Sequence, residues 1–217
     1  MNFNFEPQST FMKDKDIHSE LASIRALMER SAKFISLSGL SGIMSGIYAI
    51  IGAAAGYYIV YGSTGGLDYR DHYVTDTNIV LHLFLVALAV LLLSLFTGII
   101  LTVKNARKKG ENVWNPSSKR LLVNMAIPLV TGGTLIIIFL LRGYYGIIAP
   151  SCLIFYGLSL VAGSHYTVSD VKWLGIYEIA LGLIAACLPG YGIVFWTIGF
   201  GVLHIIYGSI MHFRYDK

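Results

Sequence analysis

Six long apolar segments restrict what this sequence can fold into more than any other feature. A helix needs about 20 mostly apolar residues to cross a bilayer. The segments cover approximately residues 34–61, 77–103, 121–141, 144–163, 171–188 and 191–212. Only 13% of the 217 residues are charged and the mean hydropathy is +0.66, whereas soluble domains carry roughly 25% charged residues. The sequence therefore predicts an all-α, six-span transmembrane helix bundle with the lipid bilayer as its solvent.

Lysine and arginine residues are distributed unequally between the two sides of this arrangement. Fourteen of the sixteen lie in the N-terminal arm, after the second span, between the fourth and fifth spans, and at the C-terminus, against Arg70 and Arg142 on the other side. The positive-inside rule then places both termini in the cytoplasm. We expect a multi-pass protein of the cell inner (plasma) membrane, with a cytoplasmic arm (1–33), a transmembrane domain (34–213) and a cytoplasmic tail (214–217). The basic residues determine topology, and no nucleic-acid partner is expected.

The N-terminal arm has the pattern of an amphipathic helix. Apolar residues recur there at helical spacing, namely Ile17, Leu21, Ile24, Met28 and Ala32, and charged residues occupy the other faces. The favoured interpretation is a helix on the membrane surface that leads into the first span. The alternative is an arm that binds a cytoplasmic protein partner.

The external loop between the first two spans is acidic. It carries Asp68, Asp71 and Asp76 beside His72, and carboxylates with a histidine are able to hold a divalent cation. A solvated acidic loop is the favoured interpretation, so we predict no metal site.

The first span is unusually rich in small residues. Ser38, Gly42 and Gly46 follow one another at four-residue spacing, and Gly52 and Gly56 repeat that spacing further along. Helices in lipid associate through close backbone approach, which small residues at this spacing permit. We therefore expect the first span to pack in the middle of the bundle. The alternative is a homo-oligomer formed through the small-residue faces.

Ionisable residues inside the spans are few, and they are the first candidates for function. Placing such a residue in a spanning helix is costly, by about 2.5–3.5 kcal/mol for Asp, Lys or Arg at the centre. The three are His82, Glu178 and His204. His82 lies near the outer end of its span, where an interfacial position is the favoured interpretation.

Glu178 and His204 are predicted to form a pair across the last two spans. They stand at nearly equal sequence distances from the Pro-Gly turn at 189–192, so an antiparallel hairpin places them at similar depth. Each is flanked by glycines at minus three and plus four, on the same helical face. These glycines are Gly175 and Gly182 around Glu178, and Gly201 and Gly208 around His204. The pair is interpreted as a buried hydrogen bond between the helices, or as a titratable site that couples pH to conformation or transport.

The C-terminal part of the chain resembles a known family. The stretch "WLGIYEIALGLIAACLPGYGIVFWTIGFGVLHIIYGSIMHFR" has a Trp-led glycine-spaced helix, a Pro-Gly turn, a second glycine-spaced helix and a basic end. In these features it is similar to the HdeD-like family of small bacterial six-helix membrane proteins. That family is associated with acid stress and has no defined activity. The resemblance implies a small bacterial inner-membrane protein and assigns no functional residues.

Three classes of function are compatible with these features. The sequence has no paired carboxylates, no H-E-x-x-H motif and no phosphate-binding loop, which argues against an intramembrane enzyme and predicts no cofactor. Prolines that are able to kink helices and the ionisable pair are compatible with a proton-linked or small-solute transporter or channel. The favoured prediction is a non-enzymatic membrane protein that senses stress or regulates a partner.

Overall fold

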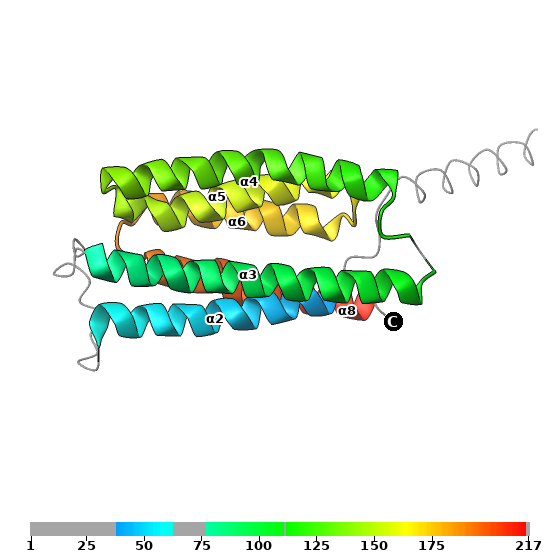
Figure 1. Ribbon diagram of the computed structural model, residues 1–217, viewed down its shortest axis with the longest axis horizontal. Helices are drawn as coiled ribbons and strands as arrows, with labels where there is room; N and C mark the ends of the chain where they lie inside the picture. Colours follow the sequence, from blue (N-terminus) through cyan, green and yellow to red (C-terminus); the bar gives the residue numbers. More distant parts are fainter. Residues whose placement is uncertain (1–37, 63–76, 111, 216–217) are drawn as a thin grey trace, which may run out of the picture. The chain divides into compact units, whose positions relative to one another are not determined.

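The computed structural model describes residues 38–62, 77–110 and 112–215. The chain divides after Lys33 into two units, and the described residues all belong to the second, Phe34–Lys217. The amphipathic arm and the acidic loop with Asp68, Asp71, Asp76 and His72 lie outside the described residues. Throughout the described ranges the regular structure is helical, without strands (Figure 1).

Among the described residues, six helices are longer than one or two turns. They are α2 (Gly39–Tyr61), α3 (Thr77–Lys108), α4 (Pro116–Arg142), α5 (Ile148–Gly163), α6 (Asp170–Cys187) and α8 (His204–Tyr215). The short α7 (Gly192–Trp196) and the π-helical segment η4 (Thr197–Leu203) lead directly into α8. Two 3₁₀ turns, η2 (Tyr145–Ile147) and η3 (Ser164–Tyr166), flank α5.

Within the part of the chain that the structure describes, five helical stretches are long and apolar enough to cross a membrane. They are Gly39–Tyr61, Asn78–Lys108, Pro116–Arg142, Tyr145–Tyr166 and Gly192–Tyr215. The segment expected at 171–188 is also helical, as α6, but it is not among the five. Its 18 residues include Asp170, Lys172 and Glu178, which make it the most charged of the expected spans for its length. The described residues therefore form an all-helical protein with the character of a multi-pass membrane protein.

Two helices extend beyond the apolar segments that predicted them. Helix α4 begins at Pro116 because Asn115 caps it: the Asn115 Oδ1 accepts from the Ser118 backbone N–H at 2.8 Å, and Ser118 Oγ accepts from the Asn115 N–H at 3.0 Å. This reciprocal arrangement satisfies two free donors at the helix start. Helix α3 continues through its basic residues to Lys108. Hydropathy marks where a helix is apolar, whereas capping groups determine where it begins.

The helices pack in two groups (Figure 1). In the first group, α2 packs on α3 and on the continuous α7–η4–α8 helix. In the second group, α5 packs on both α4 and α6. Smaller contacts of α5 and α6 with α7, η4 and α8 connect the groups. We call this connecting contact the seam.

Close glycine packing joins α2 to the last helix. A Cβ built at Gly46 would lie 2.6 Å from the Gly201 carbonyl oxygen, and one at Gly42 would lie 3.1 Å from Gly208 Cα. Ser38 is buried at the start of this contact, and its carbonyl oxygen accepts from the Ser41 hydroxyl at 2.6 Å. The small-residue face of α2 is thus occupied within the chain. Any self-association has to use a different surface from this face.

The remaining small residues serve two further contacts. On α2, a Cβ at Gly52 would lie 2.5 Å from Val90 Cγ2 of α3, and one at Gly56 would lie 3.3 Å from Leu83 Cδ2. On α6, a Cβ at Gly175 or Gly182 would lie within 2.9 Å of a carbonyl oxygen of α5. The sequence predicts helix packing at the glycines that flank Glu178 and His204. Those beside Glu178 pack α6 on α5, and those beside His204 pack the last helix on α2. Each polar residue therefore reaches the seam from its own group.

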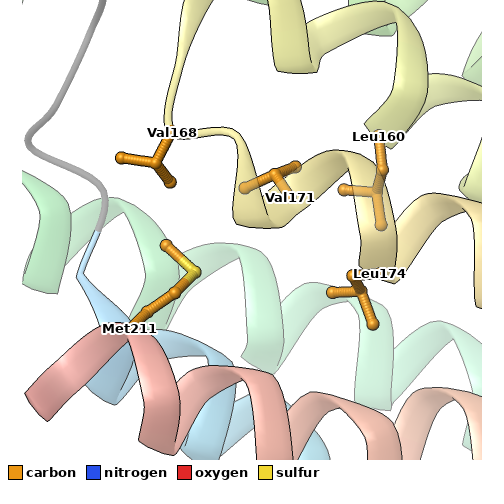
Figure 2. Close-up of a cluster of buried hydrophobic side chains, with 5 residues drawn as sticks. All are labelled: Leu160, Val168, Val171, Leu174 and Met211. Carbon is orange, nitrogen blue, oxygen red and sulfur yellow. The ribbon is translucent and has the colours of Figure 1, made fainter. Parts of the chain in front are cut away.

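An apolar cluster closes the seam on one side of the polar pair. It contains Leu160, Val168, Val171, Leu174 and Met211, drawn in Figure 2. These residues come from α5, from α6 with the connection before it, and from α8. The cluster buries apolar surface of both groups together, which favours their association.

Candidate functional site

The carboxyl group of Glu178 is the most unusual feature of the seam. The residue is fully buried, with 0% of its surface exposed, and neither side-chain oxygen has a hydrogen-bond partner among the residues that the structure describes. Burying an ionised carboxylate without hydrogen bonds costs far more than burying an apolar group. An acid in such a place requires a neighbour that compensates its charge, or has to carry a proton.

The titratable side chain beside this carboxyl group is His204, at the start of α8. Its side chain is 7% exposed, and its Nδ1 lies 3.4 Å from Glu178 Oε1. The same Nδ1 lies 3.0 Å from the Gly199 carbonyl oxygen, and Nε2 lies 2.7 Å from the Tyr156 hydroxyl of α5. The structure thus brings together the two polar residues that the sequence analysis paired, and adds a third.

These distances define a consistent arrangement of protons. The Gly199 carbonyl only accepts, so His204 Nδ1 carries a proton and donates it. In a neutral imidazole, Nε2 is then the acceptor, and the Tyr156 hydroxyl donates to it. With Glu178 protonated as well, the whole group is neutral. Loss of a proton from Glu178 or gain of one by His204 would place a net charge in this buried position.

The π-helical segment and its glycine make the close approach feasible. A Cβ built at Gly199 would lie 2.6 Å from Glu178 Oε2 and 2.5 Å from Leu153 Cδ2, so a larger residue there would force one or both of these buried side chains to shift. The wider turn of a π-helix also aligns residues five apart, as with Gly199 and His204. Such π-helical turns are frequent at functional sites.

An aromatic chain extends from the polar group along the last helix. The Tyr156 ring lies 5.2 Å from the Phe200 ring, and the Phe200 ring lies 5.9 Å from the His204 ring and 4.6 Å from that of Trp196. These centroid distances are those of favourable aromatic pairs. The Trp196 indole therefore packs on Phe200, which in turn packs on the His204 ring.

The other candidate residues lie elsewhere. His82 is at the start of α3, where its Nδ1 lies 2.6 Å from the Asn78 carbonyl oxygen, in an exposed position. Cys152 and Cys187 are free. Within the described ranges, no group of three or more His, Cys, Asp and Glu side chains is placed to hold a metal ion.

Sequence analysis missed Tyr156, Gly199 and the π-helical segment. Tyr156 is one of many tyrosines in a chain that contains 14, and nothing in its local sequence distinguishes it. Gly199 is one member of a regular glycine series. The sequence pattern therefore predicts a helix-packing role for it, and does not indicate that it lies against the Glu178 carboxyl group. The signal that could have found Tyr156 is a hydrogen-bonding side chain at the middle of an expected span.

Comparison with known proteins finds no matching family model, no matching curated protein and no matching solved structure. The resemblance to the HdeD-like family stays a prediction.

Proposed function

We propose that this chain is a non-enzymatic integral membrane protein that senses stress through the protonation of the Glu178–His204 pair. The observation that carries the proposal is the fully buried Glu178 carboxyl group, which lies 3.4 Å from His204 and has no hydrogen-bond partner in the described part of the chain. Structural hydrogen-bonding pairs normally satisfy their polar atoms. A pair that leaves both carboxyl oxygens unsatisfied is better suited to change its protonation than to fasten helices.

A change of charge on Glu178 or His204 is expected to alter the packing around the pair, because both side chains are buried. The neighbouring titratable side chains in the described chain are His204 from α8 and Tyr156 from α5, while η4 contributes Gly199 and no charge. Further along α6, Asp170 is paired with Arg214. When one member of the pair gains a charge and the other stays neutral, none of these neighbouring side chains supplies a counter-ion. The free-energy cost of such a buried charge falls most directly when water reaches the seam and solvates it.

The seam is suited to respond because its two sides belong to different helix groups. Glu178 and Tyr156 come from α6 and α5, whereas His204 and Gly199 come from the last helix. The glycine packing inside each group is tight, so each group is expected to move as a unit. Protonation would then change the relation between the groups, and a cytoplasmic partner of the N-terminal arm would receive the signal.

We also propose that α6 is a sixth span and that both termini are cytoplasmic. The outward face of α6 is apolar, with Trp173, Tyr177, Leu183 and Ile184 exposed, while Glu178 faces inward. Basic helix ends also lie close together: Lys109 Nζ donates to the Tyr215 carbonyl oxygen at 3.0 Å, and Arg214 lies 3.4 Å from Asp170. This supports a common basic side, which in a bacterial inner membrane is the cytoplasmic side.

A proton-linked transporter is the second candidate. The observation that favours it is the same seam, because transporters often place their ionisable and broken-helix elements where two helix groups meet. The close burial of Glu178 and His204 supports the sensor instead, since a transport site requires access from one side or the other. The two functions differ in whether a solute moves across a sealed vesicle.

The test uses Trp196 as a reporter of the seam. With Trp114 and Trp173 replaced by phenylalanine, the fluorescence of the remaining indole is followed against pH in lipid vesicles. The parent should change as pH falls and as pH rises. Glu178→Gln should keep only the change at falling pH, His204→Gln only the change at rising pH, and the double variant should be unresponsive. A double variant that responds like the parent would refute the proposal.

A matched control uses His82, which lies outside the seam. His82→Gln removes a titratable histidine from an exposed position on α3, and the fluorescence response should be that of the parent. If His82→Gln abolishes the response instead, proton sensing occurs elsewhere in the chain. Solute flux in sealed vesicles with the same variants would identify the transporter.

A further inference from the structure

The hydroxyl group of Tyr156 contacts the polar pair from the other side of the histidine ring. It lies 2.7 Å from His204 Nε2. In the part of the chain that the structure describes, this hydroxyl group has no second hydrogen-bond partner. Tyr156 belongs to α5 and His204 to α8, so this one hydrogen bond also joins the two helix groups across the seam.

The Tyr156 ring is held in this position by packing. Gly157, the next residue, lies against α6, because a Cβ built there would lie 2.6 Å from the Gly175 carbonyl oxygen. Successive residues of a helix point about 100° apart, so Tyr156 is directed to a different side of α5. The centroid of its ring lies 5.2 Å from that of Phe200 and 5.3 Å from that of the His204 ring. The hydroxyl group therefore has a defined position beside Nε2.

A second proton has to enter the His204 ring at Nε2. The other ring nitrogen, Nδ1, already carries a proton and donates it to the Gly199 carbonyl oxygen at 3.0 Å. Glu178 lies on that same side of the ring, 3.4 Å from Nδ1. A neutral imidazole has one nitrogen that is able to accept a proton. Here it is the atom to which the Tyr156 hydroxyl group donates, so proton uptake requires that this hydroxyl group stop donating.

The hydrogen bond of Tyr156 is therefore specific for neutral His204. Once Nε2 carries a proton it becomes a donor, and the Tyr156 O–H group has to turn away from it. The O–H group then loses the one partner that it has among the described residues. A buried donor without a partner is costly. The bond thus favours the neutral histidine and opposes the charged one.

The other titratable side chains around the ring leave Nε2 to Tyr156. Glu178 of α6 faces Nδ1, and η4 carries no titratable residue. Helix α2 meets the last helix through glycine, at Gly46. Tyr207, one turn further along α8, packs its ring against that of Tyr177, with the centroids 6.2 Å apart.

We infer that Tyr156 is a positioning residue of the proton sensor, and that its hydrogen bond to Nε2 determines the pH at which His204 takes up a proton. The inference rests on the proposed function, in which water in the seam solvates the charged histidine. Because water then replaces the hydroxyl group, the bond stabilises only the neutral, closed seam. Losing one such hydrogen bond should move proton uptake to a higher pH, by about 0.5–1 pH unit.

Nitrogen NMR of the protein with isotope-labelled histidine, in lipid vesicles, tests this inference. The His204 signals are those that are missing from His204→Gln. At neutral pH the parent should show a proton on Nδ1 and none on Nε2. Tyr156→Phe keeps the packed ring and removes only the hydroxyl group, and its His204 should take up a proton at the higher pH.

Tyr48→Phe is the matched control. The Tyr48 hydroxyl group lies 3.2 Å from Thr97 Oγ1, inside the first group, so its loss removes a hydrogen bond of the same kind away from the seam. His204 should titrate in this variant as it does in the parent. An equal shift in Tyr48→Phe would mean that any loosening of the bundle moves the titration, and would overturn the inference.

Two further outcomes would also overturn it. One is a parent with a proton on Nε2 at neutral pH. The other is a Tyr156→Phe protein whose His204 takes up a proton at the parental pH, at a lower pH or not at all. Trp196 fluorescence distinguishes these from failure of the proposed function. If His204 titrates with the expected shift while the fluorescence of the parent does not follow, the proposed function is refuted and the role of Tyr156 stands.

Discussion

At the scale of single residues, the position of the Glu178 carboxyl group depends on its neighbour Gly199. The carboxyl group occupies the space where any larger residue at position 199 would place its first side-chain carbon. The His204 side chain is held at the same point by the Gly199 carbonyl oxygen. One glycine therefore both admits the acid and orients the histidine.

Replacing Gly199 with alanine should destabilise the protein. The added methyl group would overlap Glu178 Oε2 and Leu153 Cδ2, and overpacking of this kind costs about 1–3 kcal/mol. Thermal unfolding in detergent should therefore show a lower midpoint. Gly133→Ala is the matched control, because a Cβ there meets no atom within 4 Å. It should be neutral or slightly stabilising, since alanine favours helix by about 0.5–1 kcal/mol over glycine. A Gly199→Ala variant as stable as the control would contradict this packing.

The polar group shows how far single residues are predictable from sequence. Glu178 and His204 were paired because both stand at nearly equal distances from one tight turn, and hairpin geometry alone determines their depth. Tyr156 belongs to another helix, so its approach to His204 depends on how two helix groups meet. Gly199 depends on a π-helical segment, and the local glycine spacing is equally compatible with an ordinary α-helix.

At the scale of helices, small residues decide which helices are neighbours. The faces of α2 and α6 with glycine at close spacing are the faces that approach another backbone most closely. The sequence predicted that these faces pack, because small residues permit backbone contact. It did not predict which helix each face meets, since several expected spans carry glycine series of the same kind. The flanking glycines of Glu178 therefore serve α5 rather than α8.

Replacing Gly46 with alanine should loosen the contact of α2 with the last helix. The new methyl group would lie 2.6 Å from the Gly201 carbonyl oxygen, and a backbone atom moves less readily than a side chain. We expect destabilisation of about 1–3 kcal/mol, as for other overpacked cores, measured as a lower midpoint of thermal unfolding in detergent. Gly98→Ala is the control, since nothing lies within 4 Å of a Cβ there. Equal stability of the two variants would mean that α2 is not held by this face.

At the scale of the whole molecule, the proposed topology has a direct test in intact cells. With Cys152 and Cys187 replaced, a cysteine at Asp71 should react with an impermeant thiol reagent, and a cysteine at Lys108 should be protected until the membrane is opened. The positive-inside rule requires this pattern because most basic residues belong to the Lys108 side. The reverse pattern would contradict the cytoplasmic position of both termini.

The central claim is that a change of protonation at Glu178 and His204 alters the relation between the two helix groups. Distances between spin labels report this most directly, with one label at Tyr58 of α2 and the other at Arg142 of α4. Both side chains are exposed and belong to different groups. In vesicles, the distance distribution of the parent should change between neutral and acid pH, whereas that of Glu178→Gln with His204→Gln should stay constant. A parent distribution that does not change with pH, or a double variant that changes equally, would contradict the account.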